Sequence, residues 1–523
     1  MNDKVQEPPR SLVCAIGSEE TVLSDEDIKA KLIPFLESLG PREDILILPP
    51  DFTRFHSQSG KITQFISEHY NFTPRAKDDA PPSKISKTSE GEDVSIKGGS
   101  DTEETKPPKM QILPALGTHA PMTEEQIKTM FGEELAAKKP NPFLVHEWRK
   151  DVITIGRAPS EMVKDATNGM VDQPWPAQLN KLVWSKRNHD PKTQPHKSLI
   201  LSIGQVVPHE VMGMANFNKN LFVGVGGVEA INMSHFIGAV YGMENMMGRA
   251  SNPLRSILNY ASKTYLEKEL DLWYVLTVMG TNKITGGLEM RGLYIGNDIE
   301  CYNRACDLSL KVNFTLLEKA PKKVVVYLDE GEYHSTWLGN KAIYRTRMAI
   351  ATGGELIILA PGVRKFGEDD QVDELIRQYG YVGTPAVMKA MEDSPILKEN
   401  LSAVAHLIHG SSEGRFSVTY CPGHLTREEV EGVGFKYQDL NEVQKIYDTK
   451  VLKDGWNVKK DEENGTEEEF YYVSNPALGL WATQDRFKET EEKTERNAAV
   501  SISSQQVACD GSGGVGGWEK PPV

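Results

Sequence analysis

The chain has 523 residues and a hydrophobic content of 39%, enough to bury the cores of about three domain-sized units. Its net charge of −15 and isoelectric point near 5.4 exclude nucleic acid and anionic membranes as main partners. Five scattered cysteines suit a reducing cytoplasm, the first ten residues lack a hydrophobic signal core, and no apolar run approaches the ~18 residues of a membrane span. We therefore expect a cytoplasmic protein of more than one domain.

Two predicted strands in the first quarter of the chain each run into a polar loop. The apolar residues 45–48 lead to Asp51-Phe-Thr53-Arg54, and residues 112–116 lead to Gly117-Thr-His119. Thr123 can then cap the helix that follows. Loop residues held on a rigid sheet are favoured sites for chemistry.

A third strand and its loop carry two further candidates. The apolar run 198–203 predicts a buried strand, so His209 lies in the loop past its carboxyl end, where open α/β sheets place their ligands. Lys219 follows ten residues later. After three closely spaced glycines, the pattern predicts a helix from 228 to about 240, in which His235 shares the apolar face and should point inward.

A fourth predicted strand, 324–328, precedes a polar loop that contains Trp337 and places Lys341 early in the next helix. Four strand ends therefore carry Arg54, His119, His209 and Lys341. The active site is expected in the cleft between two domains, because a closing site excludes water.

The alternation of strands and helices predicts an α/β fold with a larger N-terminal and a smaller C-terminal α/β domain. We expect the N-terminal domain at 1–320, with a disordered insertion at 73–110 that has no aromatic residue and is rich in polar and charged side chains. The C-terminal domain is expected at 321–439. A return segment at 440–483 should pack on the N-terminal domain, and 484–523 should be a flexible tail.

Together these motifs resemble the lactate racemase family, the nickel-pincer nucleotide enzymes and their homologues. The resemblance covers roughly residues 12–447, apart from the insertion. The matching positions, in the family's order, are Asp51-x-Thr53-Arg54, Gly117-Thr-His119, Pro208-His209, Lys219, His235 sixteen positions beyond that lysine, and Lys341 ahead of Gly353-Gly354.

The resemblance implies a cofactor site. Lys219 takes the role of the lysine that is joined covalently to a pyridinium thioamide/thiocarboxylate mononucleotide, which holds nickel through two sulfurs and one ring carbon. His235 would be the fourth nickel ligand, and an imidazole suits that metal. Asp51 and Thr53 are assigned to cofactor binding. Separate biosynthetic proteins would load the cofactor.

The resemblance also implies the reaction, which is inversion of the C2 centre of a small 2-hydroxy acid. His119 and His209 would be the paired acid/base residues, since imidazole titrates near working pH. Arg54 and Lys341 would hold the carboxylate and hydroxyl of the substrate, and Trp337 would line its pocket. Removing the α-proton would build a second negative charge beside the carboxylate, whereas transient transfer of a hydride to the cofactor avoids this.

The chain departs from the family before Lys219, where Asn216 and Phe217 replace two turn glycines. The change implies a reshaped pocket or amide contacts in place of backbone ones. Trp337 suggests a substrate other than lactate, larger or with extra hydroxyls. The alternative is a homologue that binds carboxylates, or a metal-dependent lyase or hydratase without the pincer. The oligomeric state stays open, a homodimer included.

Taken singly, each of these residues also has an ordinary interpretation. Lys219 would be a surface amine and His235 a packed core histidine. His406 and His409, three residues apart in an apolar helix, favour packing or capping over a metal pair, and Cys301 with Cys306 matches no zinc framework. No dinucleotide-binding glycine fingerprint or phosphate-binding loop is present.

Overall fold

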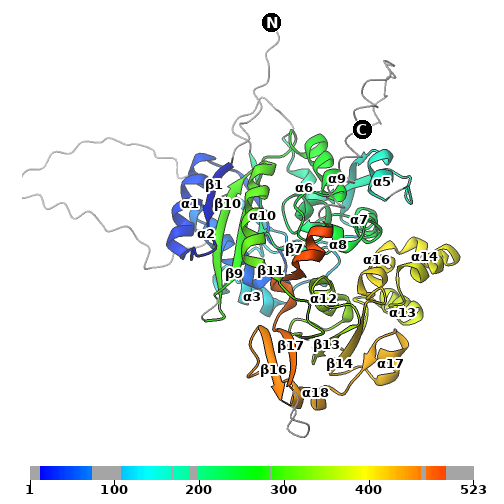
Figure 1. The fold of residues 1–523 in the computed structure, drawn as a ribbon. Coiled ribbons are helices and arrows are strands. Elements are labelled where there is room, and N and C mark those ends of the chain that lie inside the picture. The colour runs from blue at the N-terminus through cyan, green and yellow to red at the C-terminus, as the bar shows by residue number, and fades with distance from the viewer. Residues whose placement is uncertain are drawn as a thin grey trace, which may run out of the picture. The chain divides into compact units, whose positions relative to one another are not determined.

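The computed structural model describes residues 12–72, 108–167, 169–188, 197–282, 285–460 and 467–490. The fold is α/β, as expected (Figure 1). The chain forms two compact units. Unit 1 comprises Met1–Asp151, Asn180–Gln205 and Leu266–Ala305, and unit 2 comprises Val152–Leu179, Val206–Tyr265 and Cys306–Val523.

Unit 1 is built on a sheet with the strand order β1-β10-β9-β6-β2-β3. The strands β9 (Leu272–Thr281), β6 (Ser198–Gln205), β2 (Asp44–Leu48) and β3 (Lys109–Ile112) are parallel, whereas β10 (Leu288–Gly296) is antiparallel to both β9 and β1 (Leu12–Gly17). The predicted strand–loop motifs therefore end at the carboxyl edges of β2, β3 and β6. Loops from neighbouring parallel strands meet at one edge of a sheet, which brings the first two motifs together.

Helices α1 (Asp25–Ser38) and α2 (Ser59–His69) bury apolar side chains against this sheet, as Figure 1 shows beside β1 and β10. Helix α1 begins with a capping box in which Ser24 and Asp27 bond reciprocally. The same device starts α3 (Glu124–Phe131), where Thr123 and Gln126 form the box, so the predicted cap is confirmed. The remaining helices of this region are α4 (Glu133–Ala136), α6 (Lys181–Ser185) and α10 (Ile299–Asn313), which begins in unit 1.

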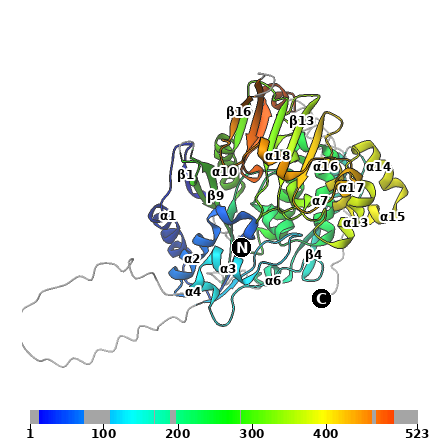
Figure 2. The same ribbon diagram turned by 90° about the horizontal axis from the view of Figure 1, so that it is seen from below.

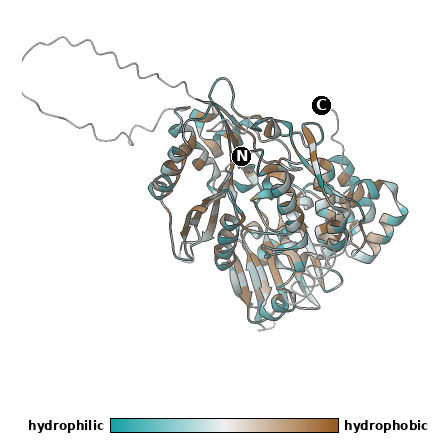
Figure 3. Cartoon of the chain, turned by 90° about the horizontal axis from the view of Figure 1, so that it is seen from above, coloured by the Kyte–Doolittle hydropathy of each residue, from teal (hydrophilic) through white to brown (hydrophobic). Residues whose placement is uncertain are grey.

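Unit 2 contains a second sheet with the order β15-β14-β13-β12-β17-β16. All neighbours are parallel except β16. The bounds are β12 (Lys323–Tyr327), β13 (Gly354–Ala360), β14 (Phe416–Pro422), β15 (Lys436–Tyr437), β16 (Gly455–Lys460) and β17 (Glu467–Val473). Figure 3 shows hydrophobic colour concentrated on the strands.

Both faces of this sheet are covered, which explains why its central strands are apolar at successive positions. Val326 and Ile358 point to a large core that includes side chains of helices α12 to α16, and Figure 1 shows α13, α14 and α16 gathered together. Val325 and Ile357 point to the opposite face, where α18 (Leu440–Ile446) packs (Figure 2).

The other elements of unit 2 carry most of the candidate residues. They are β4 (Val152–Ala158), α5 (Ser160–Ala166), β5 (Trp175–Asn180), β7 (Pro208–His209), β8 (Gly213–Met214), α7 (Val228–Tyr241), α8 (Met243–Met246), α9 (Pro253–Ala261), β11 (Phe314–Leu317), α11 (Thr336–Gly339), α12 (Lys341–Thr346), α13 (Asp370–Tyr379), α14 (Thr384–Asp393), α15 (Pro395–Glu399), α16 (Leu401–Gly410), α17 (Arg427–Gly432) and β18 (Leu480–Thr483). None of the helices in the described parts of the chain combines the length and hydrophobicity that a membrane span needs.

The two units are interleaved along the chain and do not follow the boundaries expected at 320 and 439. Residues 206–265 pack with the C-terminal segments, because α7 lies against α16. The expected return segment, 440–483, instead contributes β16 and β17 to the sheet of unit 2 and α18 to one of its faces, and β18 pairs in parallel with β11. Nothing local in the sequence marks such long-range pairings.

The expected disordered insertion falls almost wholly outside the described residues, and its last two residues, Lys109 and Met110, belong to β3. In the expected tail, residues 484–490 are helical, and the remainder lies outside the described residues.

The buried strand β13 allows a test of the core. Ile358 is fully buried, whereas Ile396 on α15 is 53% exposed. We expect Ile358→Ala to lower the free energy of unfolding by about 2–5 kcal/mol, through lost burial and a residual cavity. Ile396→Ala should change it by less than about 0.5 kcal/mol. Urea unfolding measures both, and equal effects would contradict the assigned burial.

Candidate functional site

The first group of candidate residues lies at the ends of β2 and β3 in unit 1. Asp51 precedes a short 3₁₀ helix, Phe52–Ser57, and His119 lies in the turn after β3. The Nδ1–H of His119 donates to Asp51 Oδ2 at 2.6 Å, and the Thr53 hydroxyl donates to Asp51 Oδ1 at 2.6 Å. Asp51 thus holds the ring of a predicted catalytic histidine, and Thr53 holds Asp51. Both were assigned to cofactor binding from sequence.

The Asp51 carboxylate stays ionised in this setting. Burial acts to raise its pKa, but the adjacent His119 ring, the Thr53 hydroxyl and the nearby Arg54 outweigh burial and hold the pKa of Asp51 below its usual value. An ionised carboxylate accepts the Nδ1 proton of the ring, which leaves the lone pair of the neutral ring on Nε2. The His119 side chain is 31% exposed, so the ring is accessible to solvent.

The second group, in unit 2, centres on a buried carboxylate that sequence reasoning missed. Glu210 follows His209, and its Oε2 lies 4.0 Å from Nδ1 of His209 and 3.3 Å from NH2 of Arg345. Arg345 is fully buried and also donates to the carbonyl of Pro208. Lys341 lies one turn before Arg345 on α12, so one short helix brings two cations to the segment that carries His209.

Glu210 is the anion that balances this group. Burial acts to raise its pKa, but the charges of His209, Arg345 and Lys341 prevail and keep it well below its usual value. The ring of His209 is itself fixed, because its Nδ1 accepts the backbone N–H of Val211 at 3.1 Å. A single charged residue in a buried stretch was the signal that could have identified Glu210.

The loop before Lys219 adopts an unusual backbone. Asn216 has φ +66° and Phe217 has φ +59°, so both residues at the positions where the resemblance predicted turn glycines are left-handed. This conformation costs an L residue about 1–2 kcal/mol. The replacements therefore keep a backbone path that glycine adopts without strain. Gly213, at φ +76°, is required in the same loop, because a Cβ there would lie 2.0 Å from the Arg249 carbonyl.

A buried arginine holds this loop in place. Arg255, 1% exposed on α9, donates to the carbonyl of Met214 at 2.6 Å, to the carbonyl of Asn216 at 3.3 Å and to the side chain of Asn218 at 2.6 Å. The Asn218 amide in turn donates to Asn259, also on α9, at 2.7 Å. Lys219 comes directly after the clamped residues and is half-buried.

His235 is half-buried on α7, on the side that faces α16. Its Nδ1–H donates to the Ile231 carbonyl at 2.7 Å, which places the ring lone pair on Nε2. A histidine that binds a metal commonly donates its second ring N–H to a backbone carbonyl in this way. Within the described residues, no group of three His, Cys, Asp or Glu side chains could hold a metal ion by itself.

Helix α16 supplies two buried histidines beside His235. His406 stacks on Trp337 with ring centroids 4.5 Å apart and bonds to the hydroxyls of Tyr344 at 2.9 Å and Tyr381 at 2.8 Å. Burial, with the charges of His409 and His235, lowers the pKa of His406 to about 3, so the ring is a neutral packing partner. Packing was the interpretation favoured from sequence. Trp337 is consequently held rigidly at the start of the α11–α12 segment.

Comparison with known proteins adds to this geometry. The chain is similar to lactate racemase. It is 23% identical over 269 residues to the enzyme of Thermoanaerobacterium thermosaccharolyticum, an alignment that covers 49% of this chain and 53% of that protein. The chain thus spans about half the length of this curated relative. No family model matches the sequence.

Solved structures share the fold. The lactate racemase apoprotein from the same organism superposes with a TM-score of 0.59 at 17% identity, covering 88% of this chain and 93% of that one. A structural-genomics protein from Thermotoga maritima superposes with a TM-score of 0.68 at 21% identity, covering 90% of this chain and all of the other. The α/β fold is therefore the lactate racemase fold.

The structure thus brings the predicted residues together as two groups. Asp51, Thr53, Arg54 and His119 lie in unit 1. In unit 2, His209 and Lys341 are joined through Glu210 and Arg345, and His235 lies beside α16. Their predicted roles in catalysis and binding stay predictions.

The Asp51–His119 pair predicts a pH-dependent stability. Because the pKa of Asp51 is lower in the folded chain than its usual value of 3.8, its contribution is present above about pH 4 and is lost as the pH falls through the folded-state pKa. We expect Asp51→Asn to cost about 1–3 kcal/mol at pH 7 and progressively less below pH 4. Urea unfolding across pH measures this, with the exposed Asp485→Asn as control. A pH-independent difference would contradict the assignment.

The left-handed loop predicts a reversal of the usual order of alanine and glycine. Alanine is normally the more stabilising of the two by about 0.5–1 kcal/mol. At Asn216 both replacements delete the amide, but only alanine pays for the positive φ, so Asn216→Gly should be more stable than Asn216→Ala by about 1 kcal/mol. Ala215→Gly, one residue earlier, should destabilise the chain. Thermal unfolding compares the three variants.

Proposed function

We propose that the protein is a racemase or epimerase that inverts the C2 centre of a 2-hydroxy acid and that carries a lysine-tethered nickel-pincer nucleotide. The observation that carries the proposal is the loop from Gly213 to Lys219, whose strained backbone is held by the buried Arg255. Strain of this kind persists where the surrounding structure enforces it and is concentrated at functional sites. The similarity to lactate racemase supplies the reaction class.

The residues around Lys219 fit the cofactor. The left-handed backbone at Asn216 and Phe217 keeps the path of the paired turn glycines. His235, with its Nδ1 proton committed to Ile231, has the tautomer in which Nε2 can bind nickel. Lys219 would hold the nucleotide covalently, and the bound cofactor would accept and return the substrate's hydride. Separate biosynthetic proteins would load it.

The protein's own acid/base residues handle the hydroxyl proton. We assign this role to His119 for one enantiomer and to His209 for the other. The ionised Asp51 would stabilise the imidazolium that forms when His119 takes the proton, as a buried carboxylate does in other acid/base pairs. Glu210 lies at 4.0 Å from His209 and would stabilise the second imidazolium through its charge.

The substrate's anionic end would be held by Arg54 and Lys341. Arginine offers a fork that matches a carboxylate. Glu210 interacts with Arg345 as well as with Lys341, so this group keeps an excess of positive charge that favours an anion. Trp337, fixed by its stack on His406, presents a rigid indole rather than a small polar group. We therefore propose a 2-hydroxy acid larger than lactate, or one with extra hydroxyls, as the substrate.

Mass spectrometry and metal analysis test the proposal, on protein produced together with the cofactor-making enzymes. We expect an adduct of mononucleotide mass on the Lys219 peptide and near-stoichiometric nickel. Lys219→Ala should remove the adduct, His235→Ala should lower the nickel content, and His119→Ala and His209→Ala should keep both but lose at least about 100-fold in turnover of 2-hydroxy acids.

Two matched variants control for general damage. Lys263→Ala and His424→Ala replace exposed residues of the same types and should behave as the wild type. Absence of the adduct under loading conditions would overturn the pincer proposal and return the chain to a carboxylate-binding role or a metal-dependent lyase.

A further inference from the structure

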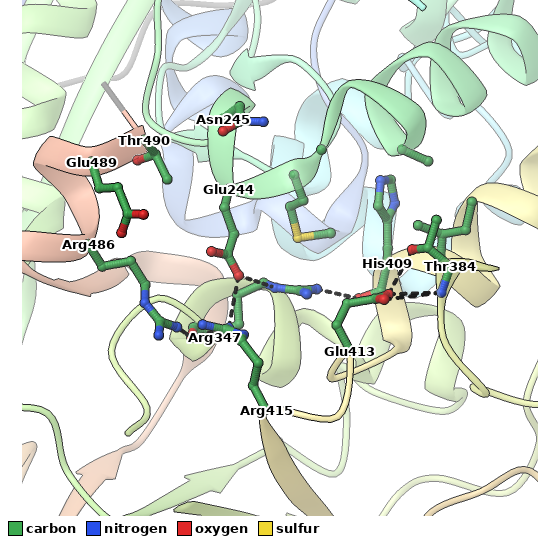
Figure 4. A pocket seen from close by; sticks show the side chains of 14 residues that line it. Glu244, Asn245, Arg347, Thr384, His409, Glu413, Arg415, Arg486, Glu489 and Thr490 are labelled. Carbon is green, nitrogen blue, oxygen red and sulfur yellow. Dashed lines mark hydrogen bonds and ion pairs between the residues drawn. The ribbon is translucent and has the colours of Figure 1, made fainter. Parts of the chain in front are cut away.

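Unit 2 contains a polar cavity of about 440 Å³ for which the proposed reaction has no use (Figure 4). It lies at the C-terminal ends of α7 and α16, and is also lined by the end of α12, the loop before β14 and the helical residues 484–490. Its size is that of a small-metabolite site. Figure 4 shows the side chains of Glu244, Arg347, Arg415 and Arg486, from separate elements, lying close together.

The inner part of the cavity has more positive than negative charge. The Glu244 carboxylate accepts from Arg347 Nε at 3.1 Å and from Arg415 NH2 at 2.8 Å, so one anion serves two guanidinium groups. Arg347 is buried and also donates to the His409 carbonyl at 3.0 Å, which satisfies the last turn of α16. Its role is therefore structural, whereas Arg415 is 22% exposed at its side chain.

Two guanidinium groups converge on one point of the wall. Arg415 NH2 donates to the Arg347 carbonyl at 2.8 Å, and Arg486 NH1 approaches the same oxygen at 3.4 Å. Among the described residues, no carboxylate forms an ion pair with Arg486. Paired guanidinium forks from different elements are the arrangement that proteins use to grip the oxygens of carboxylates and phosphates.

A buried imidazole in the same cavity lacks a partner. His409 is 3% exposed, and its Nε2 has no hydrogen bond among the described residues. Leaving a buried polar atom unsatisfied costs about 1–3 kcal/mol, so such an atom needs an explanation. An imidazole nitrogen that carries a proton can donate it to an oxygen of a bound ligand.

We propose that this cavity binds a small metabolite through a single oxyanion group, carboxylate or phosphate, gripped by Arg415 and Arg486, while His409 donates to an uncharged polar group elsewhere on the same ligand. Two exposed carboxylates at the cavity, Glu413 and Glu489, limit the negative charge that a bound ligand can carry. Glu413 is held by the N–H and hydroxyl of Thr384. These carboxylates repel polyanions, so nucleoside triphosphates are excluded and ligands with one anionic group are favoured.

Isothermal titration calorimetry of the full chain without cofactor tests this site, with inorganic phosphate and acetate as separate probes. We expect saturable millimolar or tighter binding of at least one probe, which identifies the preferred oxyanion. Arg486→Gln should weaken the binding at least about tenfold and leave the thermal unfolding midpoint of the free protein unchanged. Arg415→Gln should also weaken it, and Arg427→Gln, which breaks a comparable surface ion pair on α17, should not.

A further variant separates this site from the proposed substrate site. Lys341→Gln should leave the binding of the probes intact, since Lys341 does not line the cavity. No saturable binding to the wild type, or equal affinity in Arg486→Gln and Arg427→Gln, would overturn the proposal. None of these measurements needs a loaded cofactor, so their outcome is independent of the racemase proposal.

Discussion

The arrangement of unit 2 depends on a buried guanidinium group that donates to the backbone. Arg345 joins α12 to the segment that carries His209, through the Pro208 carbonyl and the Glu210 carboxylate. An arginine cannot lose its proton in a protein, so burial leaves it no alternative to these partners. The side chain of Arg345 consequently helps to fix His209 and Lys341 relative to each other, although Arg345 itself has neither of the roles proposed for those two residues.

The same device recurs twice in this unit. Arg255 holds the carbonyls of the loop before Lys219, and Arg347 holds the last turn of α16. In each case a guanidinium group donates to backbone carbonyls that would accept from a backbone N–H in a regular helix or strand. Loops that would otherwise sample many conformations are thereby fixed without lengthening any element. The loss in flexibility is useful where a side chain must be presented at one angle.

The sequence predicted the strand–loop motifs well, because buried parallel strands are apolar at successive residues and end at polar loops. It also identified His119 and His235 as residues of interest. It could not predict that Asp51 faces His119, since the two are far apart in the chain and meet only through the pairing of β2 with β3. The interleaved units were missed for the same reason. Arg255 carried a signal, a lone charge on an apolar helix face, whose meaning needs the loop it contacts.

At the two positions before Lys219 where the resemblance to lactate racemase predicts glycines, the chain exchanges one kind of rigidity for another. Glycine reaches a left-handed backbone without strain but adds freedom to the unfolded chain. The left-handed backbone of Phe217 is strained, and burial of its ring, which is 5% exposed, offsets this cost. Arg255 fixes the neighbouring carbonyls. The backbone that leads to Lys219 therefore keeps its path although its sequence has changed. Backbone strain of this kind persists only where the surrounding structure enforces it, and here the buried Arg255 does so.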